Sequence, residues 1–187
     1  MSKCSFRRFS LYCLVGLALW ATAGVQAWAL DPAQPPGSNF DLSHWYLGLP
    51  IDSSGGTSGT SASISVVQLV SGYVHPSYFY TGTDGSMVFW APVNGATTSG
   101  SSYPRSELRE QIVPGDNYSN WSGYGTHVLS AQCKVTQVPS VGKVIIGQIH
   151  SYSRKARPLV KLQFFKGRIG RRTGAMAGHV PGSHWAS

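Results

Sequence analysis

Short runs rich in Val, Ile, Tyr, Phe and Trp recur along the chain, and clusters of Gly, Pro, Asn and Ser separate them. Runs of this kind between turn residues are typical of β-strands. After Leu30 the sequence shows no long helical period. The pattern predicts strands over Ile64–Val70, Tyr73–Tyr80, Ser86–Ala91, Glu107–Val113, Thr126–Val138, Lys143–Tyr152 and Leu159–Phe165.

Many short strands with turns between them predict an all-β fold of antiparallel strands, either a sandwich, a jelly roll or a barrel. The end of the chain follows another pattern. Residues 168–187 contain four glycines, one proline and no alternation of polar and apolar positions. We therefore expect an irregular basic tail there, and a sheet that is incomplete at its C-terminal end.

The N-terminus has the pattern of a secretory signal peptide. Lys3, Arg7 and Arg8 precede an apolar run over residues 9–25, and Ala27-Trp28-Ala29 offers a small-x-small cleavage site. A membrane anchor is the alternative, but the run is shorter than the roughly 20 residues of a membrane span. The pattern predicts a signal peptide over residues 1–29, a folded domain over 30–167, and a secreted or periplasmic protein.

Charge is unevenly distributed along the chain. It carries 15 Lys and Arg against 7 Asp and Glu, and all seven acids lie at or before Asp116. A cation-rich half without acids favours a polyanionic partner, which could be nucleic acid, an anionic membrane surface or an acidic glycan. Export favours the glycan. We expect a monomer that binds an acidic polysaccharide, with no nucleic acid partner and no membrane contact once the leader is removed.

One candidate site lies in the predicted strand that begins near Arg105. Side chains at i and i+2 share a strand face, so Arg105, Glu107, Arg109 and Gln111 should point the same way. Glu107 could orient the two guanidinium groups, which would then present donors to a ligand carboxylate. A solvated face of ion pairs is the alternative interpretation.

A second candidate site is the strand end at Gln148 and His150, which should share a face that continues through Val144 and Ile146. An amide donor beside an imidazole can polarise a carboxylate and move a proton, although a strand-end histidine can also be purely structural. Lys161 either lines a groove or faces water. The histidines show no metal-ligand spacing with Cys133 or the acids, so we expect no metal site.

Four segments in order resemble one known family. Arg105–Glu110 resembles the R-[TSE]-E-L-R strand motif of the alginate lyases of polysaccharide lyase family seven, and Gln148–His150 resembles their Q-[IV]-H motif. Phe40–Pro50 is similar to the family's opening strand, and Ser86–Pro92 to the strand upstream of the arginine motif. Each motif is weak alone, but the ordered set is specific. The resemblance covers roughly residues 38–167.

The resemblance implies a β-jelly roll with a cationic groove that cleaves a polyuronate by β-elimination, without a metal or an organic cofactor. It implies that Arg105 and Gln148 neutralise the uronate carboxylate and that His150 is the base or a second neutralising group. Glu107, Arg109 and Lys161 would bind substrate. Neutralising the carboxylate makes the neighbouring C5 proton more acidic.

The sequence departs from the family after His150. The family's late motif Y-x-K-x-G-x-Y-x-Q, which supplies a tyrosine as the acid, has no counterpart there. The resemblance therefore predicts a C-terminally truncated or frameshifted lyase that lacks one late sheet segment. Two alternative functions follow, namely a non-catalytic polyuronate-binding module and a basic exported protein that binds anions nonspecifically.

Overall fold

The computed structural model describes residues 2–6, 29–121, 124, 126–150 and 158–173. Within them the chain forms ten strands and two short helices, of 4 and 5 residues. Every pair of named strands is antiparallel. The prediction of an all-β fold is confirmed. Among the described helices, none is both long and apolar enough to cross a membrane.

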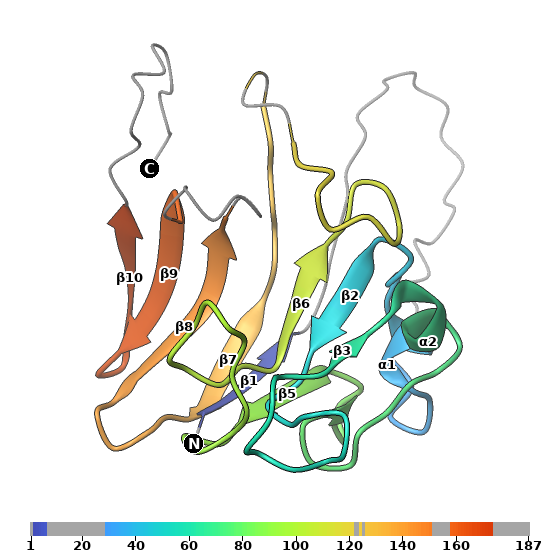
Figure 1. The fold of residues 1–187 in the computed structure, drawn as a ribbon, viewed down its shortest axis with the longest axis horizontal. Coiled ribbons are helices and arrows are strands. Elements are labelled where there is room, and N and C mark those ends of the chain that lie inside the picture. The colour runs from blue at the N-terminus through green and yellow to red at the C-terminus, as the bar shows by residue number, and fades with distance from the viewer. Residues whose placement is uncertain (1, 7–28, 122–123, 125, 151–157, 174–187) are drawn as a thin grey trace, which may run out of the picture.

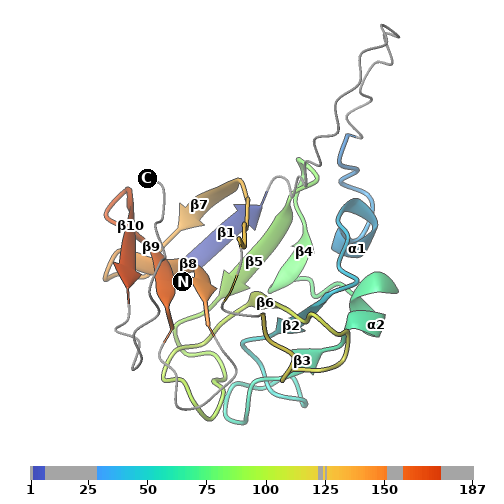
Figure 2. The ribbon, with the colours of Figure 1, turned by 90° about the horizontal axis from the view of Figure 1, so that it is seen from above.

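The strands form two layers (Figures 1 and 2). One layer consists of two three-stranded sheets, ordered β3-β2-β6 and β10-β9-β8. Their bounds are β2 Trp45–Gly48, β3 Ser63–Ile64, β6 Glu107–Glu110, β8 Lys143–Ile149, β9 Val160–Phe165 and β10 Arg168–Thr173. The other layer is a four-stranded sheet, ordered β4-β5-β1-β7. Its strands are β1 Ser2–Phe6, β4 Phe79–Thr81, β5 Met87–Ala91 and β7 Cys133–Gln137.

The core lies between the layers. Leu47 and Ile64 enter it from β2 and β3, and Phe79, Met87 and Phe89 enter it from β4 and β5. The rings of Phe79 and Phe89 have centroids 5.3 Å apart. Burying an apolar side chain of this size contributes about 1.5–3 kcal/mol, so this cluster fixes how β2 and its neighbour β6 sit against the second layer.

Helix α2 (Val66–Val70) stands where a strand was predicted over Ile64–Val70, and that part of the prediction is wrong. Ser65 and Gln68 form a capping box, in which the Ser65 hydroxyl accepts from the Gln68 amide and the Gln68 side chain accepts from the Ser65 amide. The caps satisfy amides at the helix start and outweigh the strand preference of the valines. Helix α1 (Pro36–Asn39) packs closely against α2.

Strand β10 corrects the prediction of an irregular tail for Arg168–Thr173. These residues pair with β9 from Arg168 opposite Phe165 to Thr173 opposite Val160. The turn between the strands is Lys166-Gly167, with φ of 47° and 81°. Two successive positive φ angles are typical of the tight turns that match the twist of a hairpin. The prediction was wrong because the glycines of residues 168–187 were taken as a sign of irregular structure.

Strand β1 lies between β5 and β7 in the four-stranded sheet, with Ser5 opposite both Val88 and Lys134. These residues belong to the predicted signal peptide. Residues 7–28 of that peptide and residues 174–187 of the predicted tail lie outside the described part of the chain. The signal peptide therefore stays a prediction, and the whole of β1, a strand of the four-stranded sheet, lies within it.

Candidate functional site

The first part of the site is built where β6 begins. Leu108 pairs with Leu47 and packs against the core, so strand alternation directs Glu107 and Arg109 to the outer face of the layer. Just before the strand, the Ser106 hydroxyl donates to the Tyr78 carbonyl at 2.7 Å and fixes the chain. Arg105 Nη1 then donates to Glu107 Oε1 at 2.9 Å.

The second part comes from β8, which lies beside β6 without pairing with it. Gln148 Nε2 donates to Glu107 Oε2 at 3.4 Å. Glu107 therefore uses one carboxylate oxygen for Arg105 and the other for Gln148. This contact joins two separate sheets through side chains alone.

A register shift between Ile145 and Gly147 decides what shares a face with Gln148. Lys143 and Ile145 pair with Phe165 and Gln163, and after the shift Gln148 pairs with Lys161. Because directly opposed residues share a face, Gln148 falls on the face of Lys143 and Ile145. The prediction that Val144 continues this face is wrong, since simple alternation fails at a β-bulge.

The remaining predicted site residues lie close by. Arg109 Nη2 donates to the His150 carbonyl at 3.4 Å, a second contact between β6 and the end of β8. Lys161 stands opposite Gln148 on β9. The structure thus brings the six residues together, although the roles that the resemblance assigns to them stay predictions. They are Arg105, Glu107, Arg109, Gln148, His150 and Lys161.

Exposure and charge suit a ligand with carboxylates. The side chains of Arg105 and Glu107 are 29% and 33% exposed. An ion pair this accessible contributes only about 0.2–1 kcal/mol to stability, so its main effect is to orient the guanidinium. Arg105 keeps further N–H donors beyond the one used on Glu107. Strands β8, β9 and β10 contain no acidic residue.

One residue near the site escaped the sequence reasoning, and another was wrongly predicted to face the ligand. Tyr46 pairs with Arg109 across β2 and β6 and so belongs to the same outer face. Its alternation with the buried Leu47 was the available signal. Gln111, expected on the ligand face, is 4% exposed. It accepts from the Gly115 amide at 2.8 Å and donates to Asn117 at 2.6 Å, so it orders the loop after β6.

Metal-ligating side chains do not gather in the described part of the chain: nowhere in it do three His, Cys, Asp or Glu residues meet in a way that could hold an ion. What the arrangement offers is a set of hydrogen-bond donors and cations on one outer face, with His150 at the end of β8. Such a set can bind and polarise an organic anion.

Comparison with known proteins identifies the family. The sequence model of the family described as "Alginate lyase" matches residues 40–178. This chain belongs to the alginate lyase family. The matched range contains all six site residues and the whole of β10. The resemblance found in the short motifs is thereby confirmed.

Individual members of the alginate lyase family cover the same part of the chain. An alginate lyase of Klebsiella pneumoniae is 36% identical and aligns with 62% of this chain and 46% of its own length. The structure of the family 7 alginate lyase A1-II′ in complex with substrate is 42% identical, with a TM-score of 0.61, and covers 76% of this chain and 59% of that one. An alginate lyase from Corynebacterium sp. is 27% identical, with a TM-score of 0.58 and coverages of 76% and 62%.

The chain spans about half the length of the curated alginate lyase that it matches. The part of the chain that matches the family contains the site around Arg105 and Gln148.

Proposed function

We propose that the chain acts as a polysaccharide lyase on alginate or a related polyuronate, at the face formed by Arg105, Glu107, Gln148 and His150. The observation that carries the proposal is the pair of hydrogen bonds that the Glu107 carboxylate accepts. One comes from Arg105 Nη1 at 2.9 Å, just before β6, and the other comes from Gln148 Nε2 at 3.4 Å, on β8 of the neighbouring sheet. One acidic side chain thus orients two donors side by side. Alginate lyase A1-II′, solved in complex with substrate, supports the choice of ligand.

The proposed reaction is a β-elimination. A base removes the C5 proton of a uronate, a C4=C5 double bond forms, and the glycosidic C4–O bond breaks. The leaving oxygen then takes up a proton. The charge that develops on the substrate carboxylate is stabilised by donors fixed beforehand, the kind of term that usually dominates catalysis.

Roles within this reaction follow from the family resemblance and agree with residue chemistry. Arg105 and Gln148 neutralise the carboxylate, and His150 serves as the base or as a further neutralising donor. Arg109 holds the His150 carbonyl and so fixes the end of β8. The phenol of Tyr46, on the same face by its register opposite Arg109, is our candidate for protonating the leaving oxygen.

Export belongs to the same proposal. The basic start, apolar run and Ala27-Trp28-Ala29 pattern support a secreted or periplasmic location. An exported chain would meet a polymeric substrate outside the cytoplasm.

The test is incubation of the purified full chain with alginate while ultraviolet absorbance by unsaturated uronate ends is followed. We expect absorbance to rise, and we expect Arg105→Ala to lower the rate by about 10²-fold or more, the usual effect of losing a preorganised donor. Lys134→Ala is the matched control. It removes the same charge from an exposed residue of β7, on the other layer.

A folded chain that yields no unsaturated ends would overturn the lyase proposal. Binding to immobilised alginate then separates the alternatives. Salt-sensitive retention that is lost in Arg105→Ala would identify a polyuronate-binding module, and equal retention of alginate, heparin and DNA would identify nonspecific anion binding.

A further inference from the structure

The face that carries Gln148 continues across two more strands to the edge of the layer. Lys161 on β9 pairs with Gln148 on one side and with Arg172 on the other. Toward the hairpin end, Phe165 pairs with Lys143 and with Arg168. Directly opposed residues share a face, so Lys161, Gln163, Phe165 and Arg168 all belong to the face of Gln148.

This face has the dimensions of an extended binding surface. Neighbouring strands lie about 4.8 Å apart and a strand rises about 3.3 Å per residue. From β8 to β10 the face therefore spans about 10 Å, and from Lys161 to Phe165 it runs about 13 Å. More than one ring of a polysaccharide fits on an area of that size.

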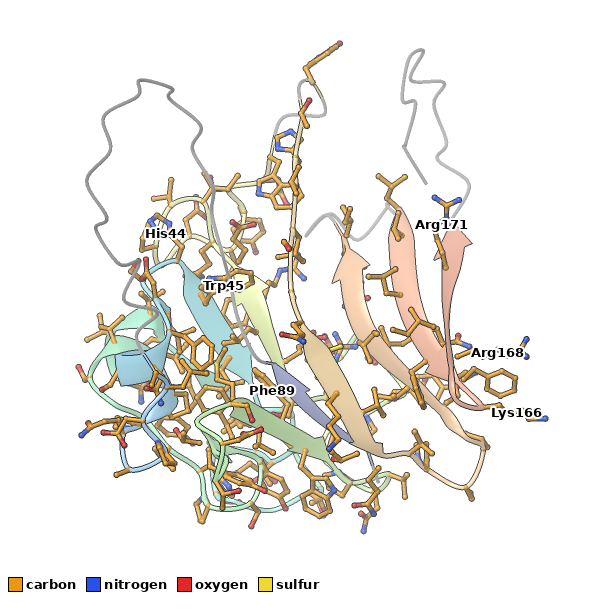
Figure 3. The ribbon with its side chains drawn as sticks, turned by 180° about the vertical axis from the view of Figure 1, so that it is seen from behind. His44, Trp45, Phe89, Lys166, Arg168 and Arg171 are labelled. Atoms are coloured by element: carbon orange, nitrogen blue, oxygen red, sulfur yellow. The ribbon has the colours of Figure 1, made fainter. Side chains whose placement is uncertain are left out.

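A hollow of about 580 Å³ follows the edge of the sheet from the Lys166 turn along β10. Gln163, Phe165, Arg168 and Gly170 line it from the face of Gln148, and Ile169 and Arg171 line it from the opposite face. Gly170 contributes to its openness, since a Cβ at that position would meet no atom within 4 Å. Figure 3 shows Lys166 and Arg168 at the hairpin end of the sheet and Arg171 at the far end of β10. The hollow thus lies along an edge strand that is open to large ligands.

Side chains in the hollow match the parts of a uronate. Phe165 is 42% exposed, an unusual position for a phenylalanine on the polar face of a strand. Its ring can cover the apolar face of a sugar, and Lys166 already lies 5.3 Å from the ring centroid. Arg168 can bind a carboxylate through two donors, and Gln163 can reach hydroxyl groups.

We propose that Gln163, Phe165 and Arg168, which continue this face beyond Lys161, form a second contact for acidic polysaccharide, which holds the part of a long chain that extends beyond the Arg105–Gln148 site. This inference rests on the proposed function. Phe165 and Arg168 lie at one corner of the β9–β10 hairpin, one and two strands away from β8. Long chains gain this contact, and short ones that end at Gln148 do not.

Charged edge strands also have a simpler use, because exposed cations discourage edge-to-edge aggregation. That explanation accounts for arginines on β10. It does not account for an exposed phenylalanine between Gln163 and Arg168 on the same face, since an apolar ring at an edge favours aggregation.

The test measures affinity against chain length by calorimetry at about 0.15 M salt, where distant surface charges are screened within about 8 Å. Polyuronate fragments of two or three sugars and of about ten sugars are titrated into the full chain. We expect the wild type to bind the longer fragment at least tenfold more tightly. In Arg168→Ala and in Phe165→Ser we expect this length advantage to fall to threefold or less.

Lys134→Ala is again the matched control, because it removes one exposed cation from β7 of the other layer and should keep the wild-type length advantage. A thermal midpoint for each variant checks that the fold persists. If Arg168→Ala and Phe165→Ser keep the advantage, or if Lys134→Ala loses it equally, the second contact is overturned. A wild type that binds no polyuronate of either length would overturn the proposed function itself.

Discussion

Glu107 is the residue that connects the two halves of the site. Its carboxylate accepts from Arg105 on one oxygen and from Gln148 on the other. At a site proposed to bind polyanions, a carboxylate opposes ligand binding by its charge, so the presence of Glu107 there argues for a positioning role. The donors gain a fixed direction at some cost in electrostatic attraction.

Replacing Glu107 by glutamine separates these two effects. We expect Glu107→Gln to lower the turnover number for alginate about tenfold or more, because Arg105 and Gln148 lose their common anchor. The Michaelis constant should stay level or fall, because the substitution removes a negative charge from the site. Steady-state kinetics by ultraviolet absorbance measures both.

Glu110→Gln is the control for this substitution. Glu110 is exposed, lies on the same strand and points to the opposite face from Glu107. The Glu110→Gln substitution removes one negative charge, as Glu107→Gln does, but keeps the Arg105–Glu107 ion pair. Unchanged turnover in Glu107→Gln, or an equal loss in Glu110→Gln, would remove Glu107 from the site.

His75 gives the fold a pH dependence below neutrality. Its pKa is lowered, first of all by burial, which disfavours the charged ring. In agreement, Nδ1 accepts from the amides of Ser77 and Tyr78 at 3.2 Å each, and the ring stacks on Tyr78 at 4.5 Å. Protonation at Nδ1 would break both hydrogen bonds.

The direction in which stability changes with pH follows from the difference in His75 pKa between the folded and unfolded chain. Because the folded-state pKa lies below the ordinary value of about 6.5, the unfolded chain takes up the proton first, and stability falls as pH drops below about 6.5. His75→Gln should flatten this decline below about pH 6.5. Urea unfolding at several pH values measures it, and a slope equal to that of the wild type would show that His75 does not carry the effect.

At the scale of elements, the β8–β9–β10 sheet is less well covered than the β2–β3–β6 sheet. Leu162 and Ile169 share the face opposite Gln148 by their register, and they are 39% and 64% exposed. In contrast, Leu47 on β2 is fully buried. Exposed apolar side chains on a strand pair at the edge of a layer favour association.

Ile169→Thr should therefore improve solubility at little cost. Threonine keeps the β-branched shape that strands prefer, and an exposed substitution usually changes stability by less than about 0.5 kcal/mol. We expect less aggregate by light scattering at an unchanged thermal midpoint. Leu47→Thr, in the buried core, serves as the contrast and should lower the midpoint sharply. A fall in the Ile169→Thr midpoint of several degrees would show that this face is packed.

Sequence patterns predicted this architecture unevenly, and the reasons lie in particular residues. The alternating runs predicted β5, β8 and β9, because their side chains face the core and the outer face in turn. Alternation failed at the bulge before Gly147, and strand preference failed at Val66, where a capping box decides the local structure. The site residues were found because motifs marked them. The link between Glu107 and Gln148 needed the structure, since 41 residues separate them.

On the scale of the whole molecule, the site depends on the four-stranded sheet of the other layer. Strands β6 and β8 belong to different sheets and meet through two side-chain contacts, Glu107 with Gln148 and Arg109 with the His150 carbonyl. A tight turn at Pro139–Gly142 connects β8 to β7 in the other layer. Whatever holds β7 in place therefore also positions Gln148.

Strand β1 is what holds β7, because it pairs with β7 on one side and β5 on the other. The proposed export and this pairing are in conflict. Cleavage after Ala29 would remove β1 and leave one edge of β5 and one edge of β7 unpaired. Unpaired edges cost backbone hydrogen bonds and invite association. We therefore expect the chain that starts at Leu30 to have a lower thermal midpoint than the full chain, by at least about 2–4 °C, the change that corresponds to 1 kcal/mol at this size.

A proline within the strand tests the same dependence without shortening the chain. Ser5 lies opposite Val88 and Lys134, so Ser5→Pro removes a backbone donor from the middle of the ladder and should lower the midpoint in the same direction as the truncation. Ser2→Pro, at the first residue of the strand, is the control and should cost less. Equal midpoints for the full chain, the Leu30 start and Ser5→Pro would show that residues 2–6 do not close the sheet in solution. The Arg105–Gln148 site would then keep its geometry after the leader is removed.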